Sequence, residues 1–437
     1  MIVPVLREEQ ARHGESAGQK AFASLSQRRS KEARLAEAVG LTAAIDLKVM
    51  QAMTVPVVRP RPATLLGSGK VDEIAGLVRL HDCGLVIVDH ALTPVQQRNL
   101  EKAWRAKVID RTGLILEIFG RRASTREGVL QVDLAHLNYQ KGRLVRSWTH
   151  LERQRGGAGF MGGPGETQIE ADRRILQEKI VRLERELDQV RRTRNLHRAK
   201  RQKVPHPVVA LVGYTNAGKS TLFNAMTGAC VLAEDMLFAT LDPTLRRMKL
   251  PHGRMIILSD TVGFISDLPT HLVAAFRATL EEVVEADLIL HVRDMSDPDA
   301  SAQASDVTAI LADLGIDAGS RPGRIIEVWN KIDLLPDDEA GALCARAAQG
   351  DDAVAVSAIS GQGIDTLVDR IETALSGRRL KRTVHLDPQH MSLISWIYDH
   401  ARVHKRIDGD DGHVELTIDI TEAESSDLDR RLDVTQP

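Results

Sequence analysis

The sequence is poor in cysteine and contains no long hydrophobic run. Its three cysteines, Cys83, Cys230 and Cys344, are too far apart to predict a disulfide framework or a metal site built from paired cysteines. No segment approaches the ~20 consecutive apolar residues of a membrane-spanning helix. The first ten residues, MIVPVLREEQ, become charged before an apolar signal segment could form. We therefore expect a cytoplasmic protein without a membrane span.

Aromatic residues are also scarce, at 3% of the chain, so stacking on unpaired bases is not expected to be a main binding device. An excess of charge of one sign is missing, because 58 Lys and Arg nearly balance 60 Asp and Glu. The balance hides an asymmetry along the chain, since residues 191–203 hold seven basic residues and no acidic one, while residues 407–437 are strongly acidic. A solvated helix face would explain the basic run, and contact with a polyanion is the alternative.

The length of 437 residues predicts two to four domains, and a hydrophobic content of 43% excludes wholesale disorder. Residues 1–30 mix Gly, Ser, Gln and charged residues without a period, which predicts a disordered extension. In residues 31–124, helical and β-rich segments alternate, as in GLVIVD (84–89), a helix expected after Thr93, and KVID (107–110). This alternation predicts a small α/β domain.

Residues 125–204 are expected to form a helical hairpin. Two long helical segments, approximately 125–147 and 166–201, flank GGAGFMGGPG (156–165), which is too rich in glycine to be helical. Apolar residues of the second segment recur at alternating spacings of four and three, from Leu176 to Val190. Such a narrow apolar seam predicts packing against an antiparallel partner helix. The hairpin would project, with a glycine-rich tip.

A phosphate-binding loop opens the next segment, residues 205–378. Residues 213–220 read GYTNAGKS and fit the pattern G-x-x-x-x-G-K-[ST], directly after the apolar strand VVALVG and before a helix. Backbone N–H groups of such a loop surround phosphates, Lys219 reaches the β- and γ-phosphates, and the Ser220 hydroxyl ligates Mg²⁺. The loop therefore predicts a nucleotide site with Mg²⁺ as cofactor.

Three further motifs identify the nucleotide. Asp260-Thr-Val-Gly263 follows an apolar strand, so Asp260 is expected to hold Mg²⁺ through water and the Gly263 N–H to contact the γ-phosphate. Asn330-Lys-Ile-Asp333 resembles the base-reading motif of GTPases, because the Asp333 carboxylate can accept from guanine N1–H and its exocyclic amine. Ser357-Ala358 matches the weaker motif that supports guanine O6. Four motifs in order, each after a strand, predict a GTPase.

The predicted site can be stated residue by residue. The nucleotide-binding residues are Gly213, Tyr214, Thr215, Asn216, Ala217, Gly218, Lys219, Ser220, Thr221, Asp260, Thr261, Val262, Gly263, Asn330, Lys331, Asp333, Ser357 and Ala358. The Mg²⁺ ligands are Ser220, Thr240 and, through water, Asp260, and the catalytic residues are Lys219, Thr240, Gly263 and Asn216. Thr240 is assigned to the first switch because FATL (238–241) resembles the F-T-T-L switch of Obg-like GTPases, with Thr244 as the alternative.

Two residues bear on the rate of hydrolysis. Phe264 follows Gly263 and cannot orient an attacking water as the glutamine of Ras-type enzymes does, so slow intrinsic hydrolysis is expected. Asn216 stands where potassium-activated GTPases carry an asparagine whose side-chain oxygen helps to hold K⁺. Such a cation would supplement charge stabilisation at the phosphates, and a merely structural role in the loop is the alternative.

Beyond the GTPase motifs, the chain resembles the HflX-type ribosome-associated GTPases, in the Obg-like branch of the P-loop GTPases. The matching residues are GSGKVDE (67–73), LTPVQQRNLE (92–101), VIDRTGLILEIF (108–119) and above all GGPGETQIEADRR (162–174), and the resemblance covers about residues 35–425. It implies a doubly wound, mostly parallel P-loop GTPase domain over 205–378, preceded by the α/β domain and hairpin and followed by a small α+β domain over 379–437. We expect the last dozen residues of that domain to be frayed.

The resemblance also implies binding to the large ribosomal subunit, with the hairpin near the peptidyl-transferase region, and GTP-linked dissociation or rescue of ribosomes under heat or other stress. A basic stem can follow rRNA phosphates, and a tip without bulky side chains can enter a narrow cavity in RNA. The expected RNA contacts are Arg153, Arg155, Phe160, Arg191, Arg192, Arg194, Arg198, Lys200 and Arg201.

The expected partners are therefore GTP, GDP, and the large subunit with its rRNA. The protein would be a monomer, cytoplasmic and partly ribosome-associated. Two alternatives stay open: a checkpoint in large-subunit assembly, as the Obg relatives suggest, and an RNA-remodelling ATPase that uses the first domain. LGSGK (66–70) is too short for the phosphate loop that the second alternative needs, and a turn before a helix is the simpler interpretation.

Overall fold

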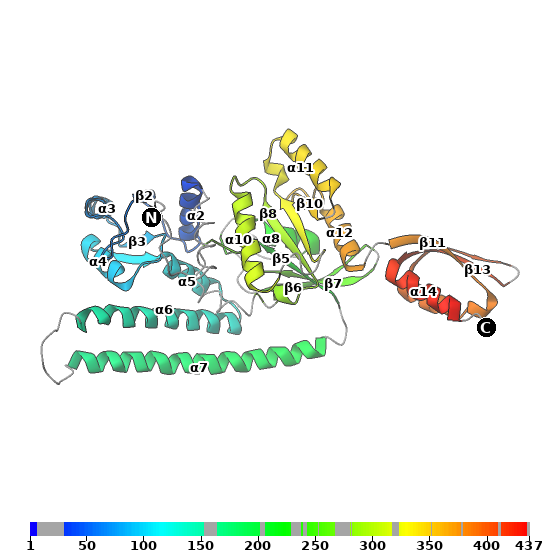
Figure 1. Cartoon of the computed structure of the whole chain (residues 1–437), viewed down its shortest axis with the longest axis horizontal. Coiled ribbons are helices and arrows are strands. Elements are labelled where there is room, and N and C mark those ends of the chain that lie inside the picture. The colour runs from blue at the N-terminus through cyan, green and yellow to red at the C-terminus, as the bar shows by residue number, and fades with distance from the viewer. Residues whose placement is uncertain are drawn as a thin grey trace.

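The computed structural model describes residues 1–6, 30–152, 164–201, 206–228, 237–238, 243–251, 253–266, 280, 282–316, 323–350, 352–376, 379–409 and 412–434. Within these residues the strands form three separate sheets, and a helical hairpin follows the first (Figure 1). The N-terminal and C-terminal regions lie at opposite ends of the molecule, on either side of the central sheet (Figure 1).

The N-terminal region contains a parallel sheet with the strand order β2-β1-β3-β4. Its elements are β1 (Ile2–Leu6), α2 (Lys31–Ala43), β2 (Met53–Val57), α3 (Ser68–Leu80), β3 (Leu85–Val88), α4 (Pro94–Trp104), β4 (Lys107–Asp110) and α5 (Arg111–Arg122). Helix α4 begins as the sequence predicts, because Thr93 forms a capping box with Gln96. Helix α5 is capped by the Asp110 carboxylate, which accepts the Gly113 N–H at 2.8 Å.

The expectation of a disordered extension over residues 1–30 is wrong for residues 2–6. They form β1, which pairs in parallel with the whole of β2 and meets β3 at Val88. Ile2 and Val3 are buried. The apolar run IVPVL is short, its partner strands come far later in the chain, and the rest of the first 30 residues is mixed in composition. The sequence therefore does not indicate a strand there. Residues 7–29 lie outside the described residues.

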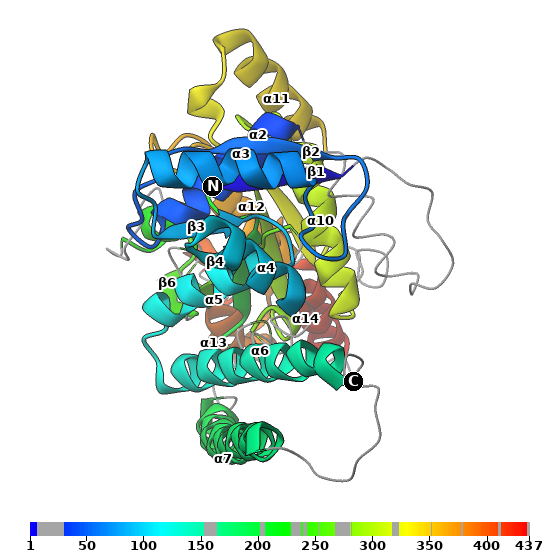
Figure 2. The same cartoon turned by 90° about the vertical axis from the view of Figure 1, so that its left-hand side faces the viewer.

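The hairpin consists of α6 (Arg126–Glu152) and α7 (Pro164–Arg201). Both views show the two helices side by side along one flank of the molecule, with α6 between α7 and the N-terminal sheet (Figures 1 and 2). Ile180 and Leu187, which belong to the predicted apolar seam of α7, are buried. The glycine-rich tip falls in residues 153–163, outside the described part of the chain.

The central sheet has the order β10-β9-β8-β5-β7-β6, with β6 antiparallel to β7 and the other pairs parallel. Its elements are β5 (Val208–Gly213), α8 (Lys219–Thr227), β6 (Thr244–Lys249), β7 (Met255–Asp260), β8 (Leu288–Asp294), α10 (Ala300–Asp313), β9 (Ile325–Asn330), the short 3-10 helix η1 (Ile332–Leu334), α11 (Asp337–Gln349), β10 (Ala353–Ala355) and α12 (Ile364–Ser376). Val209 and Leu211 pack toward α8 and α12, whereas Ala210 and Val212 pack on the opposite face toward α10. This mostly parallel, doubly covered sheet confirms the predicted fold class.

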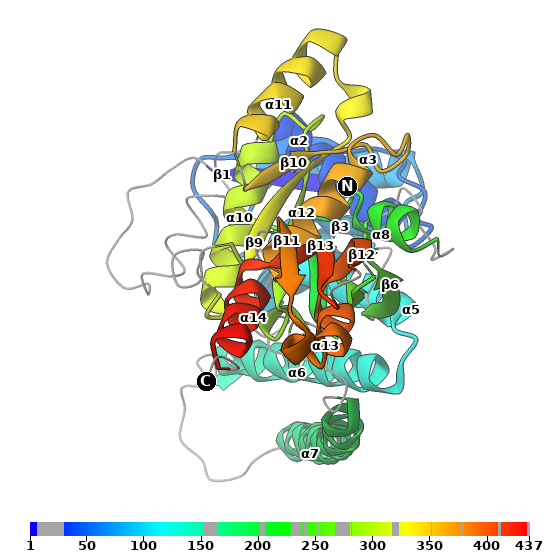
Figure 3. The same ribbon diagram turned by 90° about the vertical axis from the view of Figure 1, so that its right-hand side faces the viewer.

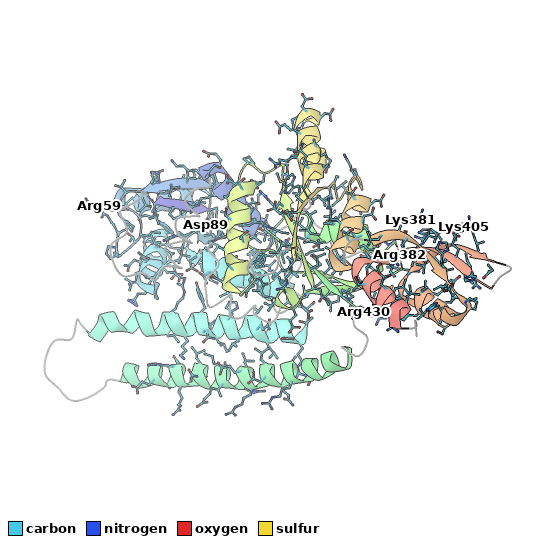
Figure 4. The ribbon with its side chains drawn as sticks, turned by 45° about the vertical axis from the view of Figure 1, so that its right-hand side comes forward. Arg59, Asp89, Lys381, Arg382, Lys405 and Arg430 are labelled. Carbon is cyan, nitrogen blue, oxygen red and sulfur yellow. The ribbon has the colours of Figure 1, made fainter. Side chains whose placement is uncertain are left out.

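The C-terminal region is an antiparallel sheet with the order β11-β13-β12. It contains β11 (Arg379–Leu386), the 3-10 helix η2 (Pro388–His390), α13 (Leu393–His400), β12 (Arg402–Asp408), β13 (Val414–Thr421) and α14 (Glu422–Val434). Figure 3 shows this end of the molecule with its two helices, and Figure 4 places Lys381 and Lys405 there, far from Arg59 of the N-terminal region. The expectation of a frayed tail is wrong for α14, because Leu428 is buried in the core of this region.

One hydrophobic cluster joins the N-terminal region to the central sheet. It contains buried residues of α2 and α5 together with Val212, Val262 and Phe264. Within it the rings of Phe119 and Phe238 meet edge to face, with centroids 4.7 Å apart. The two regions therefore share a core and are not separate bodies joined only by a linker.

Candidate functional site

The phosphate-binding loop lies between β5 and α8, and two glycines make it possible. A Cβ atom added at Gly213 would lie 2.2 Å from the carbonyl oxygen of Val292, and one added at Gly218 would lie 2.2 Å from Nδ2 of Asn330. Gly218 also adopts φ +88°, a left-handed conformation that side chains disfavour. Larger residues would therefore push the loop away from β8 and β9.

Lys219 is the first residue of α8 and is 6% exposed. Its Nζ donates to the carbonyl oxygens of Tyr214 at 2.7 Å and Gly213 at 3.1 Å, so the ammonium lies inside the curve of the loop. Burial lowers the pKa of Lys219 to about 8, although the nearby Asp260 carboxylate raises it. The cation is thus held where the phosphates of a nucleotide would lie.

Ser220 and Asp260 come together beside this loop. The Ser220 hydroxyl donates to Oδ2 of Asp260 at 2.7 Å, and Asp260 is fully buried at the carboxyl end of β7. These are hard oxygen donors of the kind that Mg²⁺ prefers. The backbone of Gly263 packs against the phosphate loop, because a Cβ atom added there would lie 2.8 Å from Thr215 Cγ2 and 3.1 Å from Lys219 Nζ. The structure therefore brings the first two motifs into one small region.

Asn330 connects the loop to the two motifs predicted to recognise the base. Its Nδ2 donates to the Ala217 carbonyl at 2.9 Å, and its Oδ1 accepts the Ala358 N–H at 3.1 Å. Lys331 has φ +65° and pairs with Asp294 at 2.7 Å. Asp333 is exposed and Ser357 fully buried. The loop and the two motifs thus meet at the carboxyl ends of parallel strands of the central sheet, where nucleotides bind in such sheets.

Other predicted site residues have different environments. Thr215, Thr261 and Val262 are buried, Thr221 is partly buried, and Asn216 is exposed with φ +62°. Thr240 lies outside the described residues. Phe264 is 3% exposed within the shared core, so its ring is packed away from solvent.

The side chain of Tyr214 points away from the phosphate loop. Its hydroxyl donates to Oε2 of Glu37 in α2 at 2.6 Å and accepts the Ser266 N–H at 2.9 Å. Arg111 of α5 in turn contacts Glu37 and Ser266. Sequence reasoning missed these residues as neighbours of the site. The one signal was the family-like segment 108–119, which contains Arg111 but no motif of known chemistry.

The predicted RNA contacts fall along the hairpin. Arg192 is exposed on α7. Arg191, Arg194, Arg198, Lys200 and Arg201 belong to the last turns of α7, and Arg153, Arg155 and Phe160 lie outside the described residues. Within the described part of the chain, no helix is both long enough and apolar enough to cross a membrane.

Comparison with known families covers nearly the whole chain. Residues 32–120 match the GTP-binding GTPase N-terminal family, 122–201 the GTP-binding GTPase Middle Region, 208–331 the 50S ribosome-binding GTPase family, and 342–437 the HflX C-terminal domain.

Individual relatives agree with these matches. The GTPase HflX of Magnetococcus marinus is 50% identical over 377 residues, which are 86% of this chain and 86% of the relative. The GTPase HflX of Escherichia coli is 45% identical over 384 residues, 88% of this chain and 89% of the relative. A solved structure of a GTP-binding protein from Sulfolobus solfataricus in complex with GDP is 23% identical, covers 79% of this chain and 96% of that chain, and has a TM-score of 0.44.

The two HflX relatives and the family matches confirm the resemblance that the sequence motifs predicted. The GTPase activity and the guanine-nucleotide binding predicted from those motifs are confirmed with them. The chain therefore belongs to the HflX family of GTPases, which hydrolyse GTP.

Proposed function

We propose that this GTPase binds the large ribosomal subunit in its GTP-bound form and dissociates or rescues ribosomes, especially under heat or other stress. Its central region matches a family described as 50S ribosome-binding GTPases. Hydrolysis of GTP would then release it from the subunit. The target is thus proposed to be the assembled ribosome and not a precursor of the subunit.

The hairpin is the observation that supports this proposal. At 1.5 Å per residue, the 38 residues of α7 span about 57 Å, longer than a small domain is wide. The last turns of α7, residues 191–201, hold six basic residues and no acidic one, and Arg192 is exposed there. A long helical pair with exposed cations suits the phosphates of folded RNA.

We propose that the GTP site works through the residues assembled at the central sheet. The backbone N–H groups of residues 213–218 and the Lys219 ammonium bind the phosphates, and Asp333, Ser357 and Ala358 recognise guanine. Asn330 keeps the loop and the base site at a fixed separation through its two hydrogen bonds. Lys219 would exchange its bonds to two carbonyl oxygens for bonds to phosphate oxygens, which carry full negative charge.

GTPases of this fold use Mg²⁺ with GTP, and the residues present fit the ion. We propose that Ser220 ligates it directly, that Asp260 holds one of its water ligands, and that Thr240 completes its shell when GTP is bound. The ion, when bound, offsets phosphate charge. Lys219 and the Gly263 N–H are proposed to stabilise the γ-phosphate as charge develops during hydrolysis.

Sedimentation of purified ribosomes tests the proposed function. With the full chain and a non-hydrolysable GTP analogue, we expect 70S particles to separate into subunits and the chain to migrate with the large subunit, whereas GDP should leave the particles intact. Intact particles that carry the chain would contradict dissociation and would favour a role in subunit assembly.

A loop deletion sharpens the experiment. Removal of residues 157–163 should leave binding to the large subunit nearly intact, because the stem supplies the cationic surface, but should abolish dissociation. If binding and dissociation fall together, the tip is an ordinary docking element. Nucleotide binding by the deletion variant serves as the control for folding.

A further inference from the structure

A buried polar network connects the N-terminal region to the phosphate loop and to the segment after Gly263. The Tyr214 hydroxyl bridges Glu37 Oε2 at 2.6 Å and the Ser266 N–H at 2.9 Å. Arg111 donates through one nitrogen, Nη2, to Glu37 Oε1 at 2.7 Å and to the Ser266 carbonyl at 3.0 Å, and it also pairs with Asp89. The side chains of Arg111 and Glu37 are both 7% exposed.

This network lies at the carboxyl edge of the N-terminal sheet. Asp89 follows β3 and Arg111 follows β4, so both are at the end of a parallel strand where an open α/β sheet normally presents its ligand site. Figure 4 shows Asp89 on the side of the N-terminal region next to the central region. In this protein the central region covers that edge, because Ser266 accepts a hydrogen bond from Arg111 and Tyr214 donates one to Glu37.

An apolar contact at the other end of α5 reaches the first switch segment. Phe119 meets Phe238 edge to face, with an interplanar angle of 78°. Phe238 is 3% exposed and adopts φ +58°, a conformation that a bulky residue keeps only when its surroundings hold it. Phe238 is the first residue of FATL, the motif that contains Thr240. Helix α5 therefore touches the beginnings of both segments that change with the nucleotide in GTPases.

The residue before Arg111 holds the hairpin. Asp110 is 2% exposed and accepts from the Tyr139 hydroxyl at 2.6 Å and from Arg143, both on α6. It also accepts backbone N–H groups of Leu92 at 3.2 Å and Gly113 at 2.8 Å. The Arg143 guanidinium lies over the Tyr139 ring, 4.2 Å from its centroid. The carboxylate is thus surrounded by donors that join α6 to α5 and the N-terminal sheet.

We propose that Asp110, Arg111 and Phe119 form a coupling element, in which Arg111 and Phe119 position the two switch segments for GTP hydrolysis and Asp110 links them to the hairpin. Arg111 acts through Glu37 and Tyr214, and Phe119 acts through Phe238, so they are positioning residues that touch no nucleotide. Because coupling between two binding sites is reciprocal, a partner bound to the hairpin would change the affinity for the nucleotide by the same factor as the nucleotide changes the affinity for that partner. The inference rests on the proposed placing of the switches and not on the ribosome as partner.

Hydrolysis by the full chain without ribosomes tests the positioning role. Tyr214→Phe deletes the hydroxyl with its hydrogen bonds to Glu37 and Ser266, and Phe119→Leu removes one aromatic ring. Each should lower kcat about three- to tenfold, as expected when a positioning contact of this kind is lost. The affinity for fluorescent GDP should stay at the wild-type value, because the loop backbone and base site are retained. An unchanged kcat in both variants would overturn the proposal.

Two control variants separate positioning from loss of stability. Leu100→Ala destabilises the same region from the opposite face of its sheet, where Leu100 belongs to a different hydrophobic cluster. Arg121 lies on α5 itself, and Arg121→Ala removes its exposed ion pair with Asp46. Both should keep the wild-type kcat. If Leu100→Ala lowers kcat as much as Tyr214→Phe at equal thermal stability, the effect is structural and the proposal is wrong.

Hydrogen exchange tests the link to the hairpin. In the full chain, replacing GDP by a non-hydrolysable GTP analogue should change amide exchange in peptides that cover residues 110–143. The change should disappear in Phe119→Leu, while the analogue still protects the phosphate loop. If the wild-type chain shows protection of the phosphate loop but no change over residues 110–143, the coupling to the hairpin is overturned.

Discussion

Lys219 is a residue at which burial and charge act in opposite directions. Its pKa in the folded protein, about 8, is below the ordinary lysine value because burial outweighs the attraction of Asp260. Between this pKa and the unfolded value the folded state binds fewer protons, so the cost of burying the charge diminishes as pH rises through that window. Bound phosphate oxygens would raise the pKa of Lys219 again, because their negative charge favours the protonated ammonium.

We therefore predict that GDP affinity falls about fourfold between pH 7 and pH 8.5, as the fraction of protonated Lys219 falls. The measurement is a titration with fluorescent GDP at several pH values and constant ionic strength. Lys219→Met should bind weakly with a flatter profile, and this variant also controls for titration of the guanine itself. A wild-type profile no steeper than that of Lys219→Met would contradict the prediction.

Asp333 gives a prediction about base specificity. Asp333→Asn should weaken GTP binding by about 1–3 kcal/mol and improve binding of xanthosine triphosphate, because an amide can donate to the carbonyl group of that base. Competition between the two nucleotides measures the shift. Asp337→Asn, an exposed change in the first turn of α11, is the matched control and should leave the preference unchanged. Unaltered GTP affinity in Asp333→Asn would remove this residue from the base site.

Asn216 gives a prediction about monovalent cations. If its side-chain oxygen helps to hold K⁺ at the phosphates, potassium should accelerate hydrolysis relative to sodium at matched ionic strength. Asn216→Gly should abolish the difference, and glycine suits φ +62° at this position, so the backbone is not strained. Equal wild-type rates in the two salts would assign Asn216 to the structure of the loop alone.

The nucleotide motifs could be predicted because each consists of a few residues at short, fixed spacings in the sequence. Lys219, Ser220 and Asp260 come together because each follows or opens an element that those spacings define. The partner of Tyr214 could not be predicted in this way. Glu37 is 177 positions away, and nothing local to either residue indicates that they meet across a shared core.

At the scale of elements, α5 and α6 pack closely at Gly113. A Cβ atom added there would lie 2.9 Å from Ile109 Cγ2, 3.0 Å from the Tyr139 hydroxyl and 3.2 Å from Asp110 Oδ1. Gly113→Ala should therefore push α6 away from the cap of α5 and reduce the free energy of unfolding by about 1–3 kcal/mol. Urea denaturation followed by circular dichroism measures this loss.

Gly142 provides the matched control for this substitution. It lies within α6, and a Cβ atom added there meets nothing within 4 Å. Gly142→Ala should stabilise the protein by about 0.5–1 kcal/mol through helix propensity alone. If Gly113→Ala and Gly142→Ala change the free energy of unfolding equally, the close approach at Gly113 does not affect stability.

The elements that sequence reasoning missed are those whose stability comes from distant neighbours. Strand β1 has five residues, and it is ordered by pairing with β2 and β3 and not by its own propensity. Helix α14 is rich in charged residues, yet the buried Leu428 attaches it to the C-terminal sheet. The long helices of the hairpin were easier to predict, because their apolar period repeats over many turns.

At the scale of the whole molecule, the proposed contact with RNA predicts a salt-dependent interaction. The triple variant Arg191→Glu, Arg194→Glu and Arg198→Glu should weaken binding to large subunits and flatten its dependence on salt, because about three phosphate contacts are lost. GTP binding should be unaffected.

Sedimentation over a range of salt concentrations measures both effects. A control with the same change of net charge reverses Arg79, Arg98 and Lys102, which are exposed on α3 and α4. Equal affinity and equal salt slope in wild type and the α7 variant would show the basic run to be a solvated helix end.

The core shared between the N-terminal and central regions also limits how the protein can diverge. A side chain at position 119 is tolerated only with a suitable partner at position 238, and a change in Phe264 or Val262 must suit residues of α2 and α5. Substitutions on the two sides should therefore arise in compensating pairs. Recombination that exchanges the central region between distant relatives should yield poorly packed chimeras unless α2 and α5 are exchanged with it.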